Sequence, residues 1–135
     1  MRPLLLDTSY LIALEVADDQ NHLAAAEHWG KLTKSLPPLI TTSYVFDEIV
    51  TFFNNRNHHS KAVEIGNTLL RSPSVELIHI DPPLLHEGWR YLQKHRDKTY
   101  SLTDCISFVV MKQRGIKTAL TFDKHFKQAG FGTLP

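Results

Sequence analysis

The chain has 135 residues, with 15 Lys and Arg against 14 Asp and Glu, which gives a formal net charge of +1. This length suits one core, so we expect residues 1–135 to form a single domain. The one cysteine, Cys105, excludes an internal disulfide framework and agrees with a cytoplasmic location. Asp7 interrupts the leucine run near the start, which is too short for a signal peptide or a membrane span.

Strand-like and helix-like segments alternate along the sequence. An apolar run at 3–6 predicts a buried strand, and helical spacing follows at 10–17. The later elements are predicted, in chain order, as a helix from 19–21 to just before Pro37, a strand at 39–42, helices at 44–55 and 60–71, a strand at 75–80, helices at 81–96 and 101–114, and a strand at 117–122. Ser43 is placed to cap the third helix, and Gly115 to end the last one in a left-handed conformation. This order predicts an α/β fold, a three-layer sandwich with a central, mostly parallel sheet flanked by helices.

The segment "YSLTDCISFVV" places a carboxylate, Asp104, at the start of a very apolar helix. From Cys105 to Met111 only Ser107 is polar, so this helix is expected to be buried on most sides. Ionised carboxylates are rarely buried unless they are paired, hydrogen-bonded or bound to a metal. Asp104 therefore needs a partner that holds it.

Three more acids are expected near the same edge of the sheet. Asp7 follows the first strand, Asp123 follows the last, and Glu48 lies early in the helix after the second strand. Two unit charges about 4 Å apart repel by about 4 kcal/mol at an effective dielectric near 20, so such a cluster requires cations. Oxygen ligands without a Cys/His pattern favour Mg²⁺ or Mn²⁺ over zinc.

Each acid also has a purely structural interpretation. Asp104 follows Ser101 at the spacing of a capping box, Asp7 can cap the helix near Ser9, and Asp123 can be an ordinary loop residue. Asp47 is as acidic as Glu48, but the two side chains point about 100° apart on a helix and cannot share a role. The hydroxyls that could hydrogen-bond these acids, or serve turns and caps instead, belong to Thr8, Ser9, Thr103 and Thr121. The eight histidines are scattered, and none is assigned a catalytic role.

Together, "LLLDTSYLIAL", the Glu48 segment, "SLTDCISFVVMKQRGI" and "ALTFDKHFKQAGF" resemble the PIN-domain ribonucleases, most of all the VapC-type toxins of toxin-antitoxin systems. The resemblance implies a PIN-like sandwich and endonucleolytic cutting of single-stranded or structured RNA. It implies Asp7, Glu48, Asp104 and Asp123 as the catalytic, metal-binding acids, and His22 as the histidine of the second helix. Tyr10 departs from the family's small aliphatic residue. A small antitoxin and a homodimer are the expected partners, with Tyr10, Trp29, Phe52 and Phe53 as candidate contacts unless they are core residues.

The chemistry expected from such a site needs no attacking side chain. A metal-activated water cuts the phosphodiester and leaves a 5′-phosphate and a 3′-hydroxyl. Without the four acids, Lys and Arg exceed Asp and Glu by 15 to 10, and nine of these bases lie from Arg90 onward, a bias suited to phosphate contacts but also to solvated helices. Tyr100, Phe122 and Phe126 can stack on bases or pack in the core.

Three alternatives to a toxin are open at this point. The first is a PIN nuclease of RNA processing. The second is a non-catalytic PIN module that binds RNA or a partner, which four intact acids disfavour. The third is a phosphoacceptor receiver domain, based on Asp81 at the end of the third strand, although the paired acids after the first strand are missing.

Overall fold

The structure, a computed structural model, describes all of residues 1–135. Its elements, in chain order, are β1 (Leu4–Leu6), α1 (Thr8–Glu15), α2 (His22–Leu32), the 3₁₀ turn η1 (Thr33–Ser35), β2 (Leu39–Thr42), α3 (Ser43–Asn54), α4 (His59–Arg71), β3 (Val75–Ile78), α5 (Pro82–Lys94), α6 (Leu102–Arg114), β4 (Thr118–Leu120), α7 (His125–Gln128) and β5 (Gly132–Leu134). No helix is long and apolar enough to cross a membrane.

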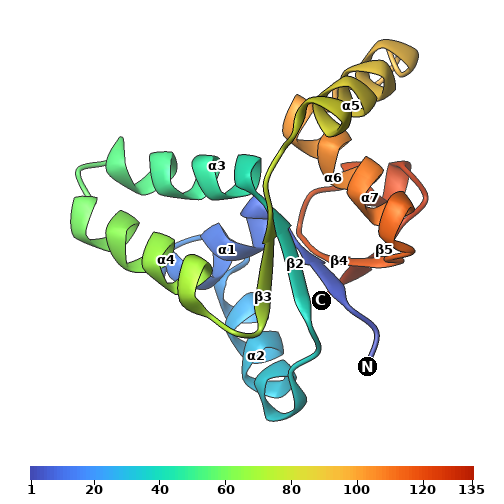
Figure 1. The fold of residues 1–135 in the computed structure, drawn as a ribbon. Helices are drawn as coiled ribbons and strands as arrows, with labels where there is room; N and C mark the ends of the chain where they lie inside the picture. Colours follow the sequence, from blue (N-terminus) through green and yellow to red (C-terminus); the bar gives the residue numbers. More distant parts are fainter.

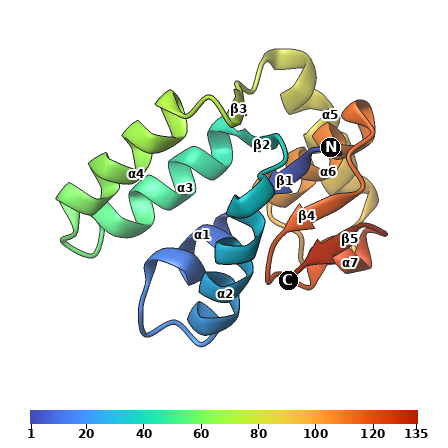
Figure 2. The ribbon, with the colours of Figure 1, turned by 90° about the horizontal axis from the view of Figure 1, so that it is seen from below.

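The five strands form one sheet in the order β3-β2-β1-β4-β5, and every neighbouring pair is parallel. The predicted α/β sandwich with a parallel sheet is confirmed. Figure 1 shows the α3–α4 hairpin on one side of the sheet and α5, α6 and α7 on the other, and Figure 2 shows α1 and α2 on the α3–α4 side. The fifth strand was not predicted, because "GTL" is only three residues long and has no apolar run.

Alternation along the strands divides the core into two clusters. In β1, Leu4 and Leu6 pack with α1, α3 and α4, while Leu5 packs on the opposite face with α6. In β4, Ala119 and Leu120 likewise separate between the two faces. Both faces of the sheet are therefore dry at β1, which is why Leu4–Leu6 reads as an unbroken apolar run.

The helix ends explain how the chain turns at the edge of the sheet. Ser101 and Asp104 form the predicted capping box of α6, and Gly115 ends this helix at φ 65°. The prediction that Ser43 caps α3 was wrong: Thr42 accepts the Val45 N–H at 3.2 Å. The Ser43 hydroxyl instead accepts the Ile80 N–H at 3.0 Å, which connects the chain just after β3 to the start of α3.

Candidate metal centre

The strand order reverses direction between β1 and β4, both of which lie inside the sheet. In parallel α/β sheets ligands bind at such a switch point, in the crevice beyond the carboxyl ends of the strands. Asp7 directly follows β1, and Asp123 lies in the turn after β4. The N-terminus of α6, which carries Asp104, contributes to the same edge. The topology therefore brings acids from three distant segments to the switch point.

Asp7 is the most buried of these acids, with 4% of its surface exposed. It is the N-cap of α1, as expected, and its Oδ2 accepts hydrogen bonds from the Ser9 N–H (3.3 Å), the Ser9 hydroxyl (2.7 Å) and the Thr121 hydroxyl (2.8 Å). Thr121 also accepts the Asp123 N–H at 2.9 Å, so one hydroxyl joins the loop of Asp123 to Asp7. Burial raises the pKa of Asp7 to about 6; the hydroxyls of Ser9 and Thr121 oppose the shift and the Asp104 charge adds to it.

Asp104 serves the capping box and the acidic cluster at once. Its Oδ2 accepts the Ser101 N–H at 3.1 Å and faces His125 Nδ1 at 3.0 Å. Burial raises the pKa of Asp104, and the negative charge of Asp123 raises it further, while the hydrogen bonds from Ser101 and His125 lower it. The structural and functional interpretations of this residue are therefore compatible.

Asp123 and His125 complete the tightest part of the cluster. One ligand atom from each of Asp104, Asp123 and His125 lies within 4.8 Å of the others, an arrangement that can hold a metal ion. Asp123 Oδ1 accepts the His125 N–H at 2.9 Å and lies 3.2 Å from His125 Nδ1. The Asp123 loop is thus folded back so that its own histidine faces two carboxylates.

Glu48 lies one step away from this cluster. Its side chain is half-buried, whereas that of Asp47 is exposed. Glu48 Oε1 accepts the Thr8 hydroxyl at 2.7 Å, and Thr8 is the residue next to Asp7. The structure therefore directs Glu48, and not Asp47, toward the acids. The 4.8 Å group includes neither the carboxylate of Glu48 nor that of Asp7.

The four acids share one feature. In each, protein donors hold a single carboxylate oxygen: Oδ2 of Asp7, Oε1 of Glu48, Oδ2 of Asp104 and Oδ1 of Asp123. The other oxygen of each acid has no hydrogen-bond donor from the protein. Four orientated carboxylates, each with one free oxygen, form a donor set of the kind that Mg²⁺ and Mn²⁺ prefer.

The sequence interpretation missed two residues of this site. These are His125, one of the scattered histidines without an assigned role, and Thr99, whose hydroxyl lies 3.1 Å from His125 Nε2. The Asp-x-His spacing in "FDKHF" was the available signal, because an aspartate in a turn commonly accepts the N–H two residues later. Of the four suggested hydroxyl residues, Thr8, Ser9 and Thr121 bond to the acids as described, whereas Thr103 makes no such bond. His22 bonds to the Ala13 carbonyl, at 2.8 Å, and Asp81 caps α5.

Four of the nine basic residues from Arg90 onward lie in two distinct places. Lys98 and Lys124 are exposed and directly precede Thr99 and His125 in the chain. Other members of the set line a hollow at the opposite edge of the sheet, together with Arg2 and the start of β1 and β4: these are Arg114 and Lys117. The expected phosphate-binding bias therefore applies to only part of the basic set.

The aromatic residues named as candidate contacts are mostly core. Tyr10 has no exposed surface, stacks on Phe122 and donates or accepts a hydrogen bond at His28 Nδ1 (2.8 Å). Tyr100 and Phe126 are buried as well. Trp29 is half-buried against Tyr10. Core packing therefore explains most of these residues.

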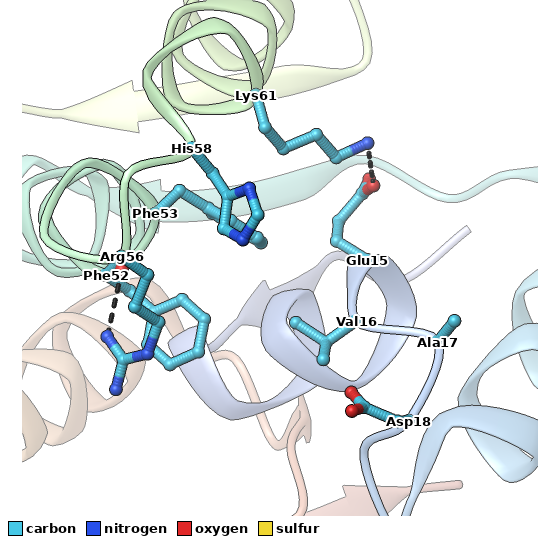
Figure 3. Close-up of a pocket in the computed structure, with 9 residues that line it drawn as sticks. All are labelled: Glu15, Val16, Ala17, Asp18, Phe52, Phe53, Arg56, His58 and Lys61. Carbon is cyan, nitrogen blue, oxygen red and sulfur yellow. Dashed lines mark hydrogen bonds and ion pairs between the residues drawn. The ribbon is translucent and has the colours of Figure 1, made fainter.

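A hollow of about 530 Å³ lies away from the acids, between the end of α1 and the turn that joins α3 to α4. Figure 3 shows Lys61 paired with Glu15 across it, at 2.7 Å, and the Arg56 guanidinium beside Phe52. Phe52 and Phe53 both line this hollow. It contains none of the four acids, so its chemistry is separate from that of the candidate metal centre.

The fold and the site define a class of α/β protein in which acids are gathered at the switch point of a parallel sheet, where ligands bind. The chain belongs to the PIN domain family, which matches residues 4–132. It is 37% identical over 127 residues, 93% of each chain, to the 23S rRNA-specific endonuclease VapC20 of Mycobacterium tuberculosis. It is 24% identical over 133 residues, 96% of this chain and 94% of the relative, to a VapC ribonuclease of Aquifex aeolicus.

Solved structures agree with this assignment. The crystal structure of M. tuberculosis VapC20, described as a sarcin-ricin loop cleaving toxin, matches with a TM-score of 0.85 and 33% identity over 95% of both chains. A toxin-antitoxin complex from Klebsiella pneumoniae matches with a TM-score of 0.67 and 14% identity, covering 98% of this chain and 96% of the other. The latter shows the fold alone.

Proposed function

We propose that the protein is a Mg²⁺- or Mn²⁺-dependent endoribonuclease and the toxin of a toxin-antitoxin pair. The observation that carries the proposal is the set of acids at the switch point, each with one oxygen held by the protein and one free. The absence of a Lys or Arg partner supports it, because unneutralised carboxylates in a buried cluster are costly unless a cation joins them. The VapC relatives, which are named as endonucleases and ribonucleases, agree with this chemistry.

Asp7, Asp104 and Asp123 would hold the cation, with Glu48 as the outer member of the set. A divalent cation, when bound, would lower the pKa of water and place positive charge beside the reacting phosphate. The residues of the chain orient the carboxylates: Ser9 and Thr121 fix Asp7, the capping box fixes Asp104, and Thr8 fixes Glu48. The Cys105 thiol beside Asp104 is not suited to act as a nucleophile, because it is buried and its pKa is raised to about 11.

The proposed substrate is RNA, and the proposed target is an exposed loop of 23S ribosomal RNA. VapC20, which shares 37% identity with this chain over nearly its full length, is named for 23S rRNA and described as cleaving the sarcin-ricin loop. Lys98 and Lys124, which directly precede Thr99 and His125 in the chain, provide phosphate contacts for such a substrate.

The proposed partners are a small antitoxin that covers the acids and a second copy of the chain. The toxin-antitoxin complex from Klebsiella pneumoniae, which has the same fold, supports the first of these. We also propose a homodimer and one domain over residues 1–135. The proposed location is the cytoplasm, because ribosomal RNA is found in that compartment.

Cleavage of ribosomes by the purified protein tests the function. With Mg²⁺ or Mn²⁺ we expect a discrete 23S rRNA cut with a 5′-phosphate and a 3′-hydroxyl, which is abolished by EDTA. The Asp104→Asn variant is the control for a contaminating nuclease. Cleavage that persists in EDTA, or products with 2′,3′-cyclic phosphates, would contradict the metal mechanism. Cleavage of other RNAs but not of ribosomes would contradict only the target.

A further inference from the structure

His125 is the one residue in the acidic cluster that could offer a nitrogen atom to a metal ion. Its closeness to Asp104 and Asp123 would by itself suggest that it is a metal ligand. Its ring is mostly buried, with 15% of the side chain exposed. Nδ1 lies 3.0 Å from Asp104 Oδ2 and 3.2 Å from Asp123 Oδ1, and Nε2 lies 3.1 Å from the Thr99 hydroxyl. The ring is also packed edge-to-face against Tyr100, with centroids 5.3 Å apart. Both nitrogens are therefore engaged.

The protonation of Nδ1 follows from its neighbours. An ionised carboxylate only accepts hydrogen bonds, so beside ionised Asp104 the Nδ1 atom must carry a hydrogen. A nitrogen that donates a hydrogen has no lone pair for a cation. The Thr99 hydroxyl can donate to Nε2, which favours this tautomer.

We propose that His125 is a positioning residue and not a metal ligand. Its Nδ1–H donates to Asp104 Oδ2 and faces Asp123 Oδ1, which is held by the His125 backbone N–H, so the other oxygen of each carboxylate is left for the cation. Thr99 fixes the tautomer of the ring. This inference rests on the proposed function, because it concerns the same metal centre. Of the three groups in the tightest cluster, Asp104 and Asp123 are then metal ligands, and His125 orients them.

Two substitutions separate the two nitrogens of the ring. The amide nitrogen of His125→Asn lies near the position of Nδ1, so this variant keeps the donor toward the carboxylates. His125→Gln places its amide nearer the position of Nε2 and loses that donor. Neither change touches the buried Phe126 beside it, and circular dichroism with melting in EDTA verifies the fold of both variants.

The test uses Mn²⁺ alone as the probe, with binding followed by electron paramagnetic resonance. Removing an orienting partner typically weakens metal binding 10–100-fold, so we expect about that loss in His125→Gln and near wild-type affinity in His125→Asn. Thr99→Val should weaken binding by a few-fold in the wild type and have no effect in His125→Asn. Spin-echo spectra of the Mn²⁺-loaded wild type should lack the coupling of a directly bound nitrogen.

A directly bound ¹⁴N coupling in the wild type that disappears in His125→Asn would overturn the inference and make His125 a ligand. Equal loss of Mn²⁺ affinity in the Asn and Gln variants would overturn it as well. A wild type that binds no Mn²⁺ would instead overturn the proposed metal centre, and the positioning role with it. The two failures are thereby distinguished.

Discussion

The two ends of α6 place charge in opposite ways. At its C-terminus, exposed Arg114 makes two hydrogen bonds to Glu76, at 2.7 and 3.2 Å, and the pairing lowers the pKa of Glu76. At its N-terminus, buried Asp104 faces Asp123 and has no Lys or Arg partner, and its pKa is raised by burial. An exposed charge such as that of Glu76 costs little free energy when it has no partner, yet it is paired with Arg114. A buried charge such as that of Asp104 costs much more, yet it has no Lys or Arg partner. Such an inversion marks a functional site, where electrostatic cost is retained for binding.

The largest expected effect comes from removing a charge at the acidic end. Asp104→Asn keeps the size of the side chain but removes one carboxylate from the cation site, so we expect RNA cleavage to fall by at least about a hundredfold. The matched control at the other end of the same helix is Glu76→Gln, which should cleave RNA at the wild-type rate. Equal rates for wild type and Asp104→Asn would break the comparison.

The next effect concerns stability and pH. The pKa of Asp7 is about 6 in the folded chain against 3.8 without burial, so its contribution to stability is complete below pH 3.8 and is lost as the pH rises through about 6. Asp7→Asn, which still caps a helix, should therefore increase the free energy of unfolding in EDTA well above pH 6, by up to about 3 kcal/mol.

Urea unfolding of wild type and Asp7→Asn at several pH values measures this difference. The stabilisation should shrink as the pH falls toward 3.8, where wild-type Asp7 is itself neutral. A variant that is less stable than wild type at every pH would show that the hydrogen bonds from Ser9 and Thr121 outweigh the cost of burial.

A smaller effect on RNA cleavage is expected for Glu48, which lies outside the tightest group of the acidic cluster. Glu48→Gln should reduce cleavage about tenfold, because this carboxylate is held by Thr8 outside the tightest group. The neighbouring change Asp47→Asn, on the exposed side of α3, should have no effect. If Asp47→Asn reduces cleavage and Glu48→Gln does not, then α3 presents Asp47, and not Glu48, to the site.

The smallest effect belongs to the paired end. Glu76→Gln removes an exposed ion pair with Arg114, so the free energy of unfolding should fall by at most about 1 kcal/mol, with salt reducing the difference. Thermal unfolding at low and high ionic strength measures it. A salt-insensitive loss of several kcal/mol would mean that this pair is structural and that the two ends of α6 are less different than their geometry indicates.

The strong local signals made most of this fold predictable. Apolar runs gave four strands, and the acids after them pointed to the switch-point edge, because a parallel sheet places all its carboxyl ends together. The capping box of Ser101 and Asp104 and the glycine end at Gly115 were likewise readable. The short strand Gly132–Leu134 was not, since its three residues have no pattern of their own and are specified by pairing with β4.

The placement of the acids at one edge of the sheet, and of Thr8, Ser9 and Thr121 as hydroxyls near them, follows from the sequence, but the contacts of His125 do not. The position of His125 depends on the turn in which Asp123 accepts the His125 N–H, and on a loop that brings Thr99 from 26 residues away. Such contacts across the chain leave no periodicity in the sequence. The sequence indicated Thr121 as a hydroxyl near the acids, but not that its partner would be Asp7, 114 residues away.

The most direct test of the cation site compares melting curves of wild type and Asp104→Asn, each in EDTA and in saturating Mg²⁺. The raised pKa of Asp104 means that its charge destabilises the metal-free fold, so the variant should melt higher than wild type in EDTA. It should also gain less from Mg²⁺, because a cation that binds only the folded state stabilises it in proportion to its affinity. A variant that melts lower than wild type in EDTA and gains as much from Mg²⁺ would show that Asp104 is a helix cap and not a ligand.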